Sequence, residues 1–280
     1  MFRFMLAPLE GYTNSTFRTL CFRHGADLTY TEMAHVESFL RENNAALQKI
    51  EVRDTTSVQI QLLTGKEENL ERFLTRFNSF PGFSGFNLNL SCPSRDVISH
   101  GKGAAMIKRV AKTNRLVSII HNHGFICSLK LRLGANEYEK RHKIYLNSIR
   151  EVNADFFIVH AKTATQESRE LEDSSVYPEC VEAASGKPII ANGGIYSSEK
   201  VKQVKAMGVS GAMIGRAALM NPAIFDVIRN ELGYNDPPTL IPSIKNLKLE
   251  YQRLHSEFGN QEDYSERFHS VVGKILKQEF

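Results

Sequence analysis

Short apolar runs alternate with amphipathic segments along most of this chain. The apolar runs are rich in Val, Ile, Leu and Phe, as is typical of parallel strands that are buried on both faces. They predict strands at residues 4–7, 28–31, 57–62, 85–90, 127–131, 156–160, 188–191 and 212–214. A segment with helical period follows nearly every run, so strands and helices alternate.

The amphipathic segments carry their apolar residues on one face and have recognisable caps. In residues 67–77, for example, Leu70 and Phe73 share one side of a helix. An earlier helix begins after a cap at Asn14 or Ser15. The predicted helices are 15–24, 37–42, 67–77, 104–107, 113–121, 138–152, 177–184, 198–207 and 223–232.

Eight strand–helix units within about 230 residues are typical of a (β/α)8 barrel, the TIM-barrel form of the α/β class. A doubly wound sheet is the competing arrangement, although such sheets usually have fewer strands. After Gly233 the segment GYNDPP breaks the pattern, and two helices are predicted at 244–258 and 264–278. We therefore expect a barrel at residues 1–233 and a small C-terminal helical domain at 234–280.

Composition narrows the class of protein. The chain has 280 residues with a hydrophobic content of 42%, which is enough for a substantial core. No apolar run approaches the ~20 residues that span a membrane, and the N-terminus lacks a signal-peptide pattern. The four cysteines are widely spaced without a CxxC pair, which argues against disulfides and against a zinc site. We expect a cytoplasmic protein without metal, and a monomer as the simplest state.

The net charge of +4 is unevenly distributed. Between Arg95 and Arg150 the chain has twelve Lys or Arg residues and three Asp or Glu residues. One interpretation is a set of solvated helix faces, and the other is a surface for a polyanion such as RNA. The cluster includes the loop that follows the fourth strand, which slightly favours the second interpretation.

That loop begins with Cys92, which lies between Ser91 and Pro93, just after the predicted strand 85–90. Pro93 ends strand pairing, and glycines further along let the loop fold tightly. A cysteine at the carboxyl end of a strand is well placed for chemistry, but most free cysteines are small core residues. The residues alone leave both interpretations open.

In a (β/α)8 barrel the chemistry belongs at the carboxyl ends of the strands. Here those ends carry polar or conformationally permissive residues. One such residue is usually structural, but a set of them in register indicates a site. The candidates are Ala7, Pro8, Thr31, Glu32, Gln61, Asn89, Cys92, Lys130, His160, Asn192, Gly193, Gly194, Gly215 and Arg216.

Two of these strand ends predict a phosphate site. ANGGI and MIGRAAL place glycines where backbone amides can approach an anion, and Arg216 adds a positive charge. In barrels of this type the loops after the seventh and eighth strands hold phosphate, although two ordinary tight turns are the alternative. Lys130, on a strand buried on both faces, also requires a negative partner, such as an anionic ring.

The combination of motifs resembles the tRNA-dihydrouridine synthases. The segments that match that family in order and spacing are MLAPLEGYTNSTFR, TEM, IQLLTG, NLSCPSRDV with GKGAAMI, SLKLRLG, VHAKT, ANGGI and MIGRAALMNP. The resemblance covers residues 1–232, which is the whole predicted barrel. We recognise no motif of the family in the two-helix tail.

The resemblance implies an FMN enzyme that reduces the 5,6 double bond of selected uridines in tRNA, with NADPH as the electron source. Cys92 would be the general acid that protonates carbon 5. Lys130 and Gln61 would face the pyrimidine ring of the flavin, while Arg95 and Lys102 would contact tRNA. The rest of the FMN site would be Ala7, Pro8, Asn89, His160, Asn192, Gly193, Gly194, Gly215 and Arg216, the last four with His160 around the phosphate.

The sequence departs from the family pattern at a few positions. Leu9 replaces the usual methionine, and a glycine is common near Thr64. Ala161 and Lys162 replace a glycine and an arginine. Because a lysine cannot reproduce the bidentate contacts of an arginine, the change at Lys162 affects a phosphate or RNA contact. The tail is shorter than usual, which bears on how tRNA is held.

Three other functions match parts of the pattern. NLSCP also resembles a motif of FMN-dependent dihydroorotate and dihydropyrimidine dehydrogenases, which act on free pyrimidines. The continuation of that motif, the basic cluster and the helical tail favour the tRNA enzyme. A noncatalytic tRNA-binding protein would not require Cys92 or the flavin positions. A phosphate-binding barrel lyase would use Lys130 as a Schiff-base nucleophile and would bind no flavin.

Overall fold

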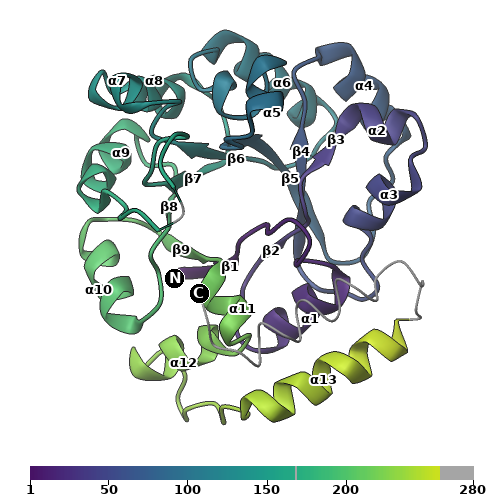
Figure 1. The fold of residues 1–280 in the computed structure, drawn as a ribbon, viewed down its shortest axis with the longest axis vertical. Helices are drawn as coiled ribbons and strands as arrows, with labels where there is room; N and C mark the ends of the chain where they lie inside the picture. The colour runs from purple at the N-terminus through teal and green to yellow at the C-terminus, as the bar shows by residue number, and fades with distance from the viewer. Residues whose placement is uncertain (168, 259–280) are drawn as a thin grey trace.

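The computed structural model describes residues 1–167 and 169–258. Within them the strands form a parallel sheet that is rolled into a barrel, with helices around its outside (Figure 1). The strands are β1 (Arg3–Leu6), β2 (Thr29–Tyr30), β3 (Ala34–His35), β4 (Val58–Leu63), β5 (Phe83–Leu90), β6 (Cys127–Arg132), β7 (Phe156–His160), β8 (Ile189–Asn192) and β9 (Gly211–Ile214).

The strand order confirms the (β/α)8 barrel. Hydrogen-bonded neighbours follow the order β1-β9-β8-β7-β6-β5-β4-β2, and a parallel bridge between Met5 and Leu28 closes the ring. The first and last strands are therefore neighbours, with Leu6 paired to Ile214. The doubly wound alternative is excluded, because its sheet stays open. The additional strand β3 pairs with the end of β4.

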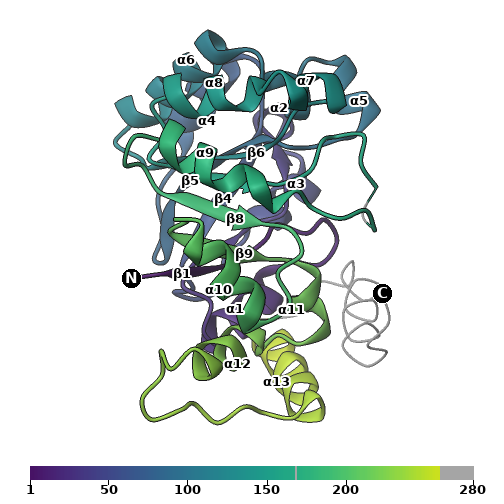
Figure 2. The same ribbon diagram turned by 90° about the vertical axis from the view of Figure 1, so that its left-hand side faces the viewer.

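Helices follow most of the strands and cover the outer face of the barrel, as Figures 1 and 2 show. The α-helices are α1 (Ser15–Arg23), α2 (Val36–Leu40), α3 (Asn44–Ile50), α4 (Glu67–Arg76), α5 (Arg95–Ser99), α6 (Val110–Asn122), α7 (Glu137–Arg141), α8 (Ile144–Glu151), α9 (Tyr177–Ala183), α10 (Ser198–Ala206), α11 (Arg216–Met220), α12 (Ile224–Glu231) and α13 (Ile244–Glu257). Short 3-10 helices are η1 (Gly103–Met106) and η2 (Ser174–Val176).

The structure differs from the predicted elements in a few places. The single helix predicted at 138–152 is wrong: α7 and α8 are separate, because Lys143 between them has a left-handed backbone with φ 52°. Strand β3 and the short helices α3, α5 and α11 were not expected, since such short elements show little periodicity. The predicted tail helix 264–278 lies outside the described residues.

The interior of the barrel has two unlike halves. One half is apolar and consists of Met5, Ala7, Leu28, Tyr30, Phe156, Ile158, Ile190 and Met213. The other half, on β4, β5 and β6, holds the buried polar side chains of Gln59, Gln61, Asn87, Asn89, Ser128 and Lys130. A second, larger apolar core lies between the barrel and its helices. The polar half of the interior extends to the carboxyl ends of these strands, at the mouth of the barrel.

The tail helix α13 lies along the outside of the barrel against α1 (Figure 1). Asn14 Nδ2 donates a hydrogen bond to the Tyr251 hydroxyl at 3.0 Å, and His24 Nε2 lies 2.9 Å from Glu250 Oε2. The buried face of α13 includes Tyr251. The first half of the predicted tail is thus attached to the barrel through polar and apolar contacts.

Among the described residues, no helix combines the length and the apolar character that crossing a membrane requires. Nor does this part of the chain bring together three His, Cys, Asp or Glu side chains in a way that suits a metal ion.

Candidate active site

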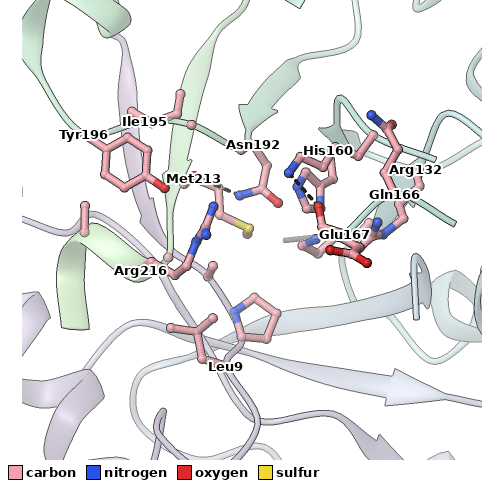
Figure 3. Close-up of a pocket in the computed structure, with 18 residues that line it drawn as sticks. Leu9, Arg132, His160, Gln166, Glu167, Asn192, Ile195, Tyr196, Met213 and Arg216 are labelled. Atoms are coloured by element: carbon pink, nitrogen blue, oxygen red, sulfur yellow. Dashed lines mark hydrogen bonds between the residues drawn. The ribbon is translucent and has the colours of Figure 1, made fainter. Parts of the chain in front are cut away.

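A cavity of about 240 Å³ opens at the carboxyl ends of the strands, where this fold is expected to hold its site. Figure 3 shows His160, Asn192 and Arg216 arranged around it. The strand ends selected from the sequence therefore meet in one place. Nine of the eleven predicted cofactor residues line the cavity, namely Ala7, Pro8, Lys130, His160, Asn192, Gly193, Gly194, Gly215 and Arg216.

The turn after β8 has a backbone that favours glycine. Gly193 and Gly194 have φ angles of +105° and +62°. A β-carbon at Gly193 would also lie only 2.9 Å from the ring of His160. Both positions therefore need glycine, and such a turn can bring backbone amides close to an anion.

Asn192 fixes this turn to its surroundings. Its backbone N–H donates to the Tyr177 hydroxyl at 3.2 Å. Its side-chain Nδ2 donates to the carbonyl oxygen of Met213 on β9 at 2.9 Å (Figure 3). This hydrogen bond joins β8 to β9. It therefore fixes the position of the glycine turn relative to Arg216, at the start of α11, across the cavity.

Lys130 lines the cavity from β6 and is only 7% exposed. Burial, and then the charge of Arg132, lower the pKa of Lys130 to about 7, while Cys92 acts in the opposite direction. Among the described residues, no acidic side chain forms an ion pair with Lys130. Charging this buried lysine is costly by itself, and an anionic ligand beside it would offset that cost.

His160 is neutral in this setting. Burial lowers its pKa to about 2, together with the charges of the surrounding cations Lys130, Arg132, Lys162 and Arg216. A neutral imidazole can donate or accept a hydrogen bond but adds no charge to the site. His160 is therefore suited to orient a ligand rather than to neutralise one.

Lys162 forms an ion pair with a carboxylate next to the glycine turn. Its Nζ lies 3.4 Å from Glu172 Oε1 and donates to the carbonyl oxygen of Glu167 at 3.1 Å. Glu172 in turn touches the glycines, since a β-carbon at Gly194 would lie 2.5 Å from its Oε2. The Glu172 carboxylate therefore lies at the place where the sequence predicts a phosphate.

Several residues that line the cavity could not be predicted from the sequence pattern. Gln166 and Glu167 come from the loop after β7, and Tyr196 follows the glycine turn. None of them lies at a strand end or in a glycine motif, which were the two signals that located the site. Tyr196 is close to a predicted residue all the same, because the Arg216 guanidinium lies 6.0 Å from the centre of its ring.

Gln61 and Asn89, the other two predicted cofactor residues, lie beside Lys130 in the polar half of the barrel interior, which we also call the polar wall. Asn89 is in register with Lys130 across β5 and β6, and its Nδ2 donates to Gln61 Oε1 at 2.9 Å. Asn89 Oδ1 accepts from the backbone N–H groups of Ser91 and Cys92 at 2.9 and 2.8 Å. The wall is therefore connected directly to the loop that carries the thiol.

Cys92 is partly exposed, whereas the other three cysteines, Cys21, Cys127 and Cys180, are buried. Burial raises the pKa of each of those three thiols. Cys92 is close enough to Lys130 and Arg132 to influence the pKa of both. Cys92 therefore belongs to the barrel mouth, and the interpretation as a buried core residue does not fit.

The two predicted tRNA contacts differ in their surroundings. Arg95 is exposed, at the first residue of α5. Lys102 is less accessible than Arg95: its side chain is 16% exposed, and its Nζ pairs with Glu37 Oε1 at 2.9 Å. Glu37, from a distant part of the sequence, thus covers the charge of Lys102. A substrate contact at either residue stays a prediction.

The residues around the cavity fit a phosphorylated cofactor with an anionic ring. Lys130, Arg132, Lys162 and Arg216 all line it, against Glu167 in the same lining and Glu172 beside the glycine turn. The Nε of Arg132 is buried without a hydrogen-bond partner in the described structure. An excess of positive charge and a buried unsatisfied donor are what an anionic ligand would satisfy.

Comparison with known proteins identifies the family. The family model for dihydrouridine synthase (Dus) matches residues 5–278. The chain belongs to the dihydrouridine synthase family. A probable tRNA-dihydrouridine synthase of Helicobacter pylori is 30% identical over 262 residues, which cover 90% of this chain and 76% of that protein. tRNA-dihydrouridine synthase B of Pseudomonas putida is 27% identical over 91% of this chain and 77% of its own length.

Among solved structures, an old yellow enzyme homologue from Zymomonas mobilis has a TM-score of 0.51 at 14% identity, over 88% of this chain and 92% of that one. This likeness shows the barrel fold. Membership of the dihydrouridine synthase family makes the chain an oxidoreductase. It also favours the tRNA enzyme over a dehydrogenase of free pyrimidines.

Proposed function

We propose that this protein is a tRNA-dihydrouridine synthase that binds FMN and receives its electrons from NADPH. The observation that carries the proposal is Lys130, a buried lysine that lines the cavity without an acidic partner among the described residues. Family membership supports the same activity. We further propose that residues 1–233 bind FMN, that 234–280 contribute to tRNA binding, and that the protein is a monomer.

Residues of the cavity would hold FMN by charge and by shape. Lys130 would face the pyrimidine part of the flavin, where its charge stabilises negative charge on the ring. Gly193 and Gly194 would bring backbone amides to the phosphate, and Arg216 would neutralise it. His160, being neutral, would orient the phosphate or a ring carbonyl. Gln61 and Asn89 would present amide groups to the ring edge, while Ala7, Pro8, Asn192 and Gly215 would shape the cavity.

Reduction of the uracil ring requires a hydride and a proton. When bound and reduced by NADPH, FMN would supply the hydride that adds to carbon 6. The Cys92 thiol would then give its proton to carbon 5, as a general acid. The thiol is partly exposed and lies at the mouth, so a base that has left its stack can reach it. Arg95 would contact the tRNA backbone nearby.

Mass analysis of tRNA tests this proposal. Unmodified tRNA is incubated with the protein, FMN and NADPH, and uridines are examined for a gain of two hydrogen atoms. Free uracil and orotate, tested in parallel, separate the tRNA enzyme from an enzyme of free pyrimidines. A protein that shows no flavin spectrum with added FMN, or that reduces free pyrimidines but not tRNA, would contradict the proposal.

A further inference from the structure

A series of hydrogen bonds runs along the polar half of the barrel interior. It begins at the carbonyl oxygen of Ser84, which accepts from Gln59 Nε2 at 3.2 Å. Gln59 Oε1 accepts from the Ser128 hydroxyl at 2.6 Å. The Ser128 oxygen accepts from Asn87 Nδ2 at 2.7 Å. These bonds join β4, β5 and β6 below the cavity.

The series continues upward to the loop that carries the thiol. Asn87 Oδ1 accepts from Gln61 Nε2 at 2.7 Å, and Gln61 Oε1 accepts from Asn89 Nδ2 at 2.9 Å. Asn89 Oδ1 then accepts from the backbone N–H groups of Ser91 and Cys92. We call the five linked side chains the amide ladder, which consists of Gln59, Ser128, Asn87, Gln61 and Asn89.

The two ends of the amide ladder give it one direction. A carbonyl oxygen such as that of Ser84 can only accept, and a backbone N–H such as that of Cys92 can only donate. If the amides were turned over, Asn89 would present its NH2 group to two N–H donors. The ladder side chains are at most 8% exposed, so water does not readily replace a lost partner. Each amide therefore has one favoured orientation.

We infer that Asn87 and Ser128 are positioning residues, which orient the Gln61 and Asn89 amides and through them hold Cys92 in place for proton transfer. The inference rests on the proposed function, because it concerns the thiol that would protonate uridine. Neither residue lines the cavity. They lie below the cavity and keep the side-chain amides of Gln61 and Asn89 from rotating by half a turn. From the apolar half of the interior, the Tyr30 hydroxyl reaches the ladder at Ser128.

Two variants interrupt the ladder and one serves as a matched control. Ser128→Ala removes one oxygen, and Asn87→Leu removes both polar groups of an amide while keeping its branched shape. Ser57→Ala removes a hydroxyl that meets the Ser84 hydroxyl at 2.8 Å, close to the lower end of the ladder but outside it. If Asn87→Leu does not fold, Ser128→Ala decides the question alone.

The first measurement is the rate at which iodoacetamide alkylates Cys92, followed by peptide mass analysis of the purified protein. It needs neither tRNA nor turnover, and the other three cysteines are buried. Because a freed Asn89 amide can turn away from the Cys92 N–H, both ladder variants should react at least about threefold faster than wild type. Ser57→Ala should react at the wild-type rate.

The second measurement is single-turnover reduction of tRNA by the prereduced holoenzyme. The rate constant should fall about three- to tenfold in the ladder variants, with the tRNA concentration for half-maximal rate unchanged. Wild-type alkylation rates in both ladder variants would overturn the inference, whatever the activity. Faster alkylation in a protein that never reduces tRNA would leave the positioning role intact and contradict the proposed function instead.

Discussion

Lys130 lowers the stability of the protein when no anion faces it. Its pKa in the folded chain is about 7 against a usual 10.5, so between these values the unfolded chain binds more protons. Lys130→Met is expected to raise the free energy of unfolding of the flavin-free protein at neutral pH by on the order of 3 kcal/mol. The gain should shrink as the pH rises from about 7 toward 10.5, because the proton that the wild-type lysine loses on folding then costs progressively less to remove.

Urea unfolding at several pH values measures this gain, with the exposed Lys245 on α13 changed to Met as the control. Flavin affinity should fall in Lys130→Met and stay unchanged in the control. A gain in stability that is the same at every pH would mean that the charge of Lys130 is not its cause.

Glu172 is expected to oppose cofactor binding. Its carboxylate pairs with Lys162 and lies against Gly194, where a phosphate is proposed to bind. Glu172→Gln removes a like charge from that place and releases Lys162, so the affinity for FMN should rise by about tenfold. Fluorescence titration of FMN measures the change, and Glu199→Gln on α10 is the control. An affinity that falls would show that Glu172 orders the turn instead.

Cys92→Ala separates the two half-reactions. The variant should bind FMN and accept electrons from NADPH, because those steps rely on the cavity residues and not on the thiol. Transfer to uridine should slow by ~10²–10⁴-fold, the usual contribution of a positioned general acid. Rapid mixing measures both steps. If both slowed equally, or if tRNA reduction kept its rate, Cys92 would not be the proton donor.

Single residues show where sequence reasoning was sufficient. Strand-end positions located Lys130, His160 and the glycines, because the fold itself brings those ends together. The sequence did not predict which charged side chains pair with one another. The pairing of Lys102 with Glu37, and the position of Glu172 against the glycine turn, depend on loop paths that no local pattern encodes.

Two helices far apart in the sequence depend on Asn14. Its Oδ1 caps α1 by accepting from the Phe17 N–H at 2.9 Å, and its Nδ2 donates to Tyr251 on α13. Asn14→Ala loses both bonds and should lower the free energy of unfolding by about 1–3 kcal/mol. Tyr251→Phe keeps the cap but loses the bond from Asn14, and should cost about 0.5–1.5 kcal/mol. Equal losses in urea unfolding would show that the cap contributes nothing.

Strands were easier to predict than short helices. A buried parallel strand is a continuous apolar run, so all eight barrel strands were found close to their true bounds. A helix of five residues, such as α5 or α11, spans little more than one turn and has no repeat to detect. The break between α7 and α8 depends on one left-handed residue, Lys143, whose type gives no warning.

The charges of the basic cluster between Arg95 and Arg150 are not equivalent in the folded molecule. Arg95 is exposed, whereas the charge of Lys102 is already paired with Glu37. Arg95→Ala should therefore weaken tRNA binding. It should also lower the slope of log Kd against the logarithm of the salt concentration by about 1. Lys102→Met should leave that dependence unchanged. Binding measured over a range of salt concentrations compares them, and equal slopes for both variants would place the tRNA elsewhere.

The pairing of β1 with β9 bears on how this chain is made. During synthesis the residues of β1 leave the ribosome first, but their partners at 211–214 follow only near the end of the barrel. The strands β4, β5 and β6, with all the hydrogen-bonding side chains between them, are complete once residue 132 has emerged. The nascent chain therefore contains the polar wall of the site before the ring can close. Until then one side of β1 is an open edge, exposed to other chains.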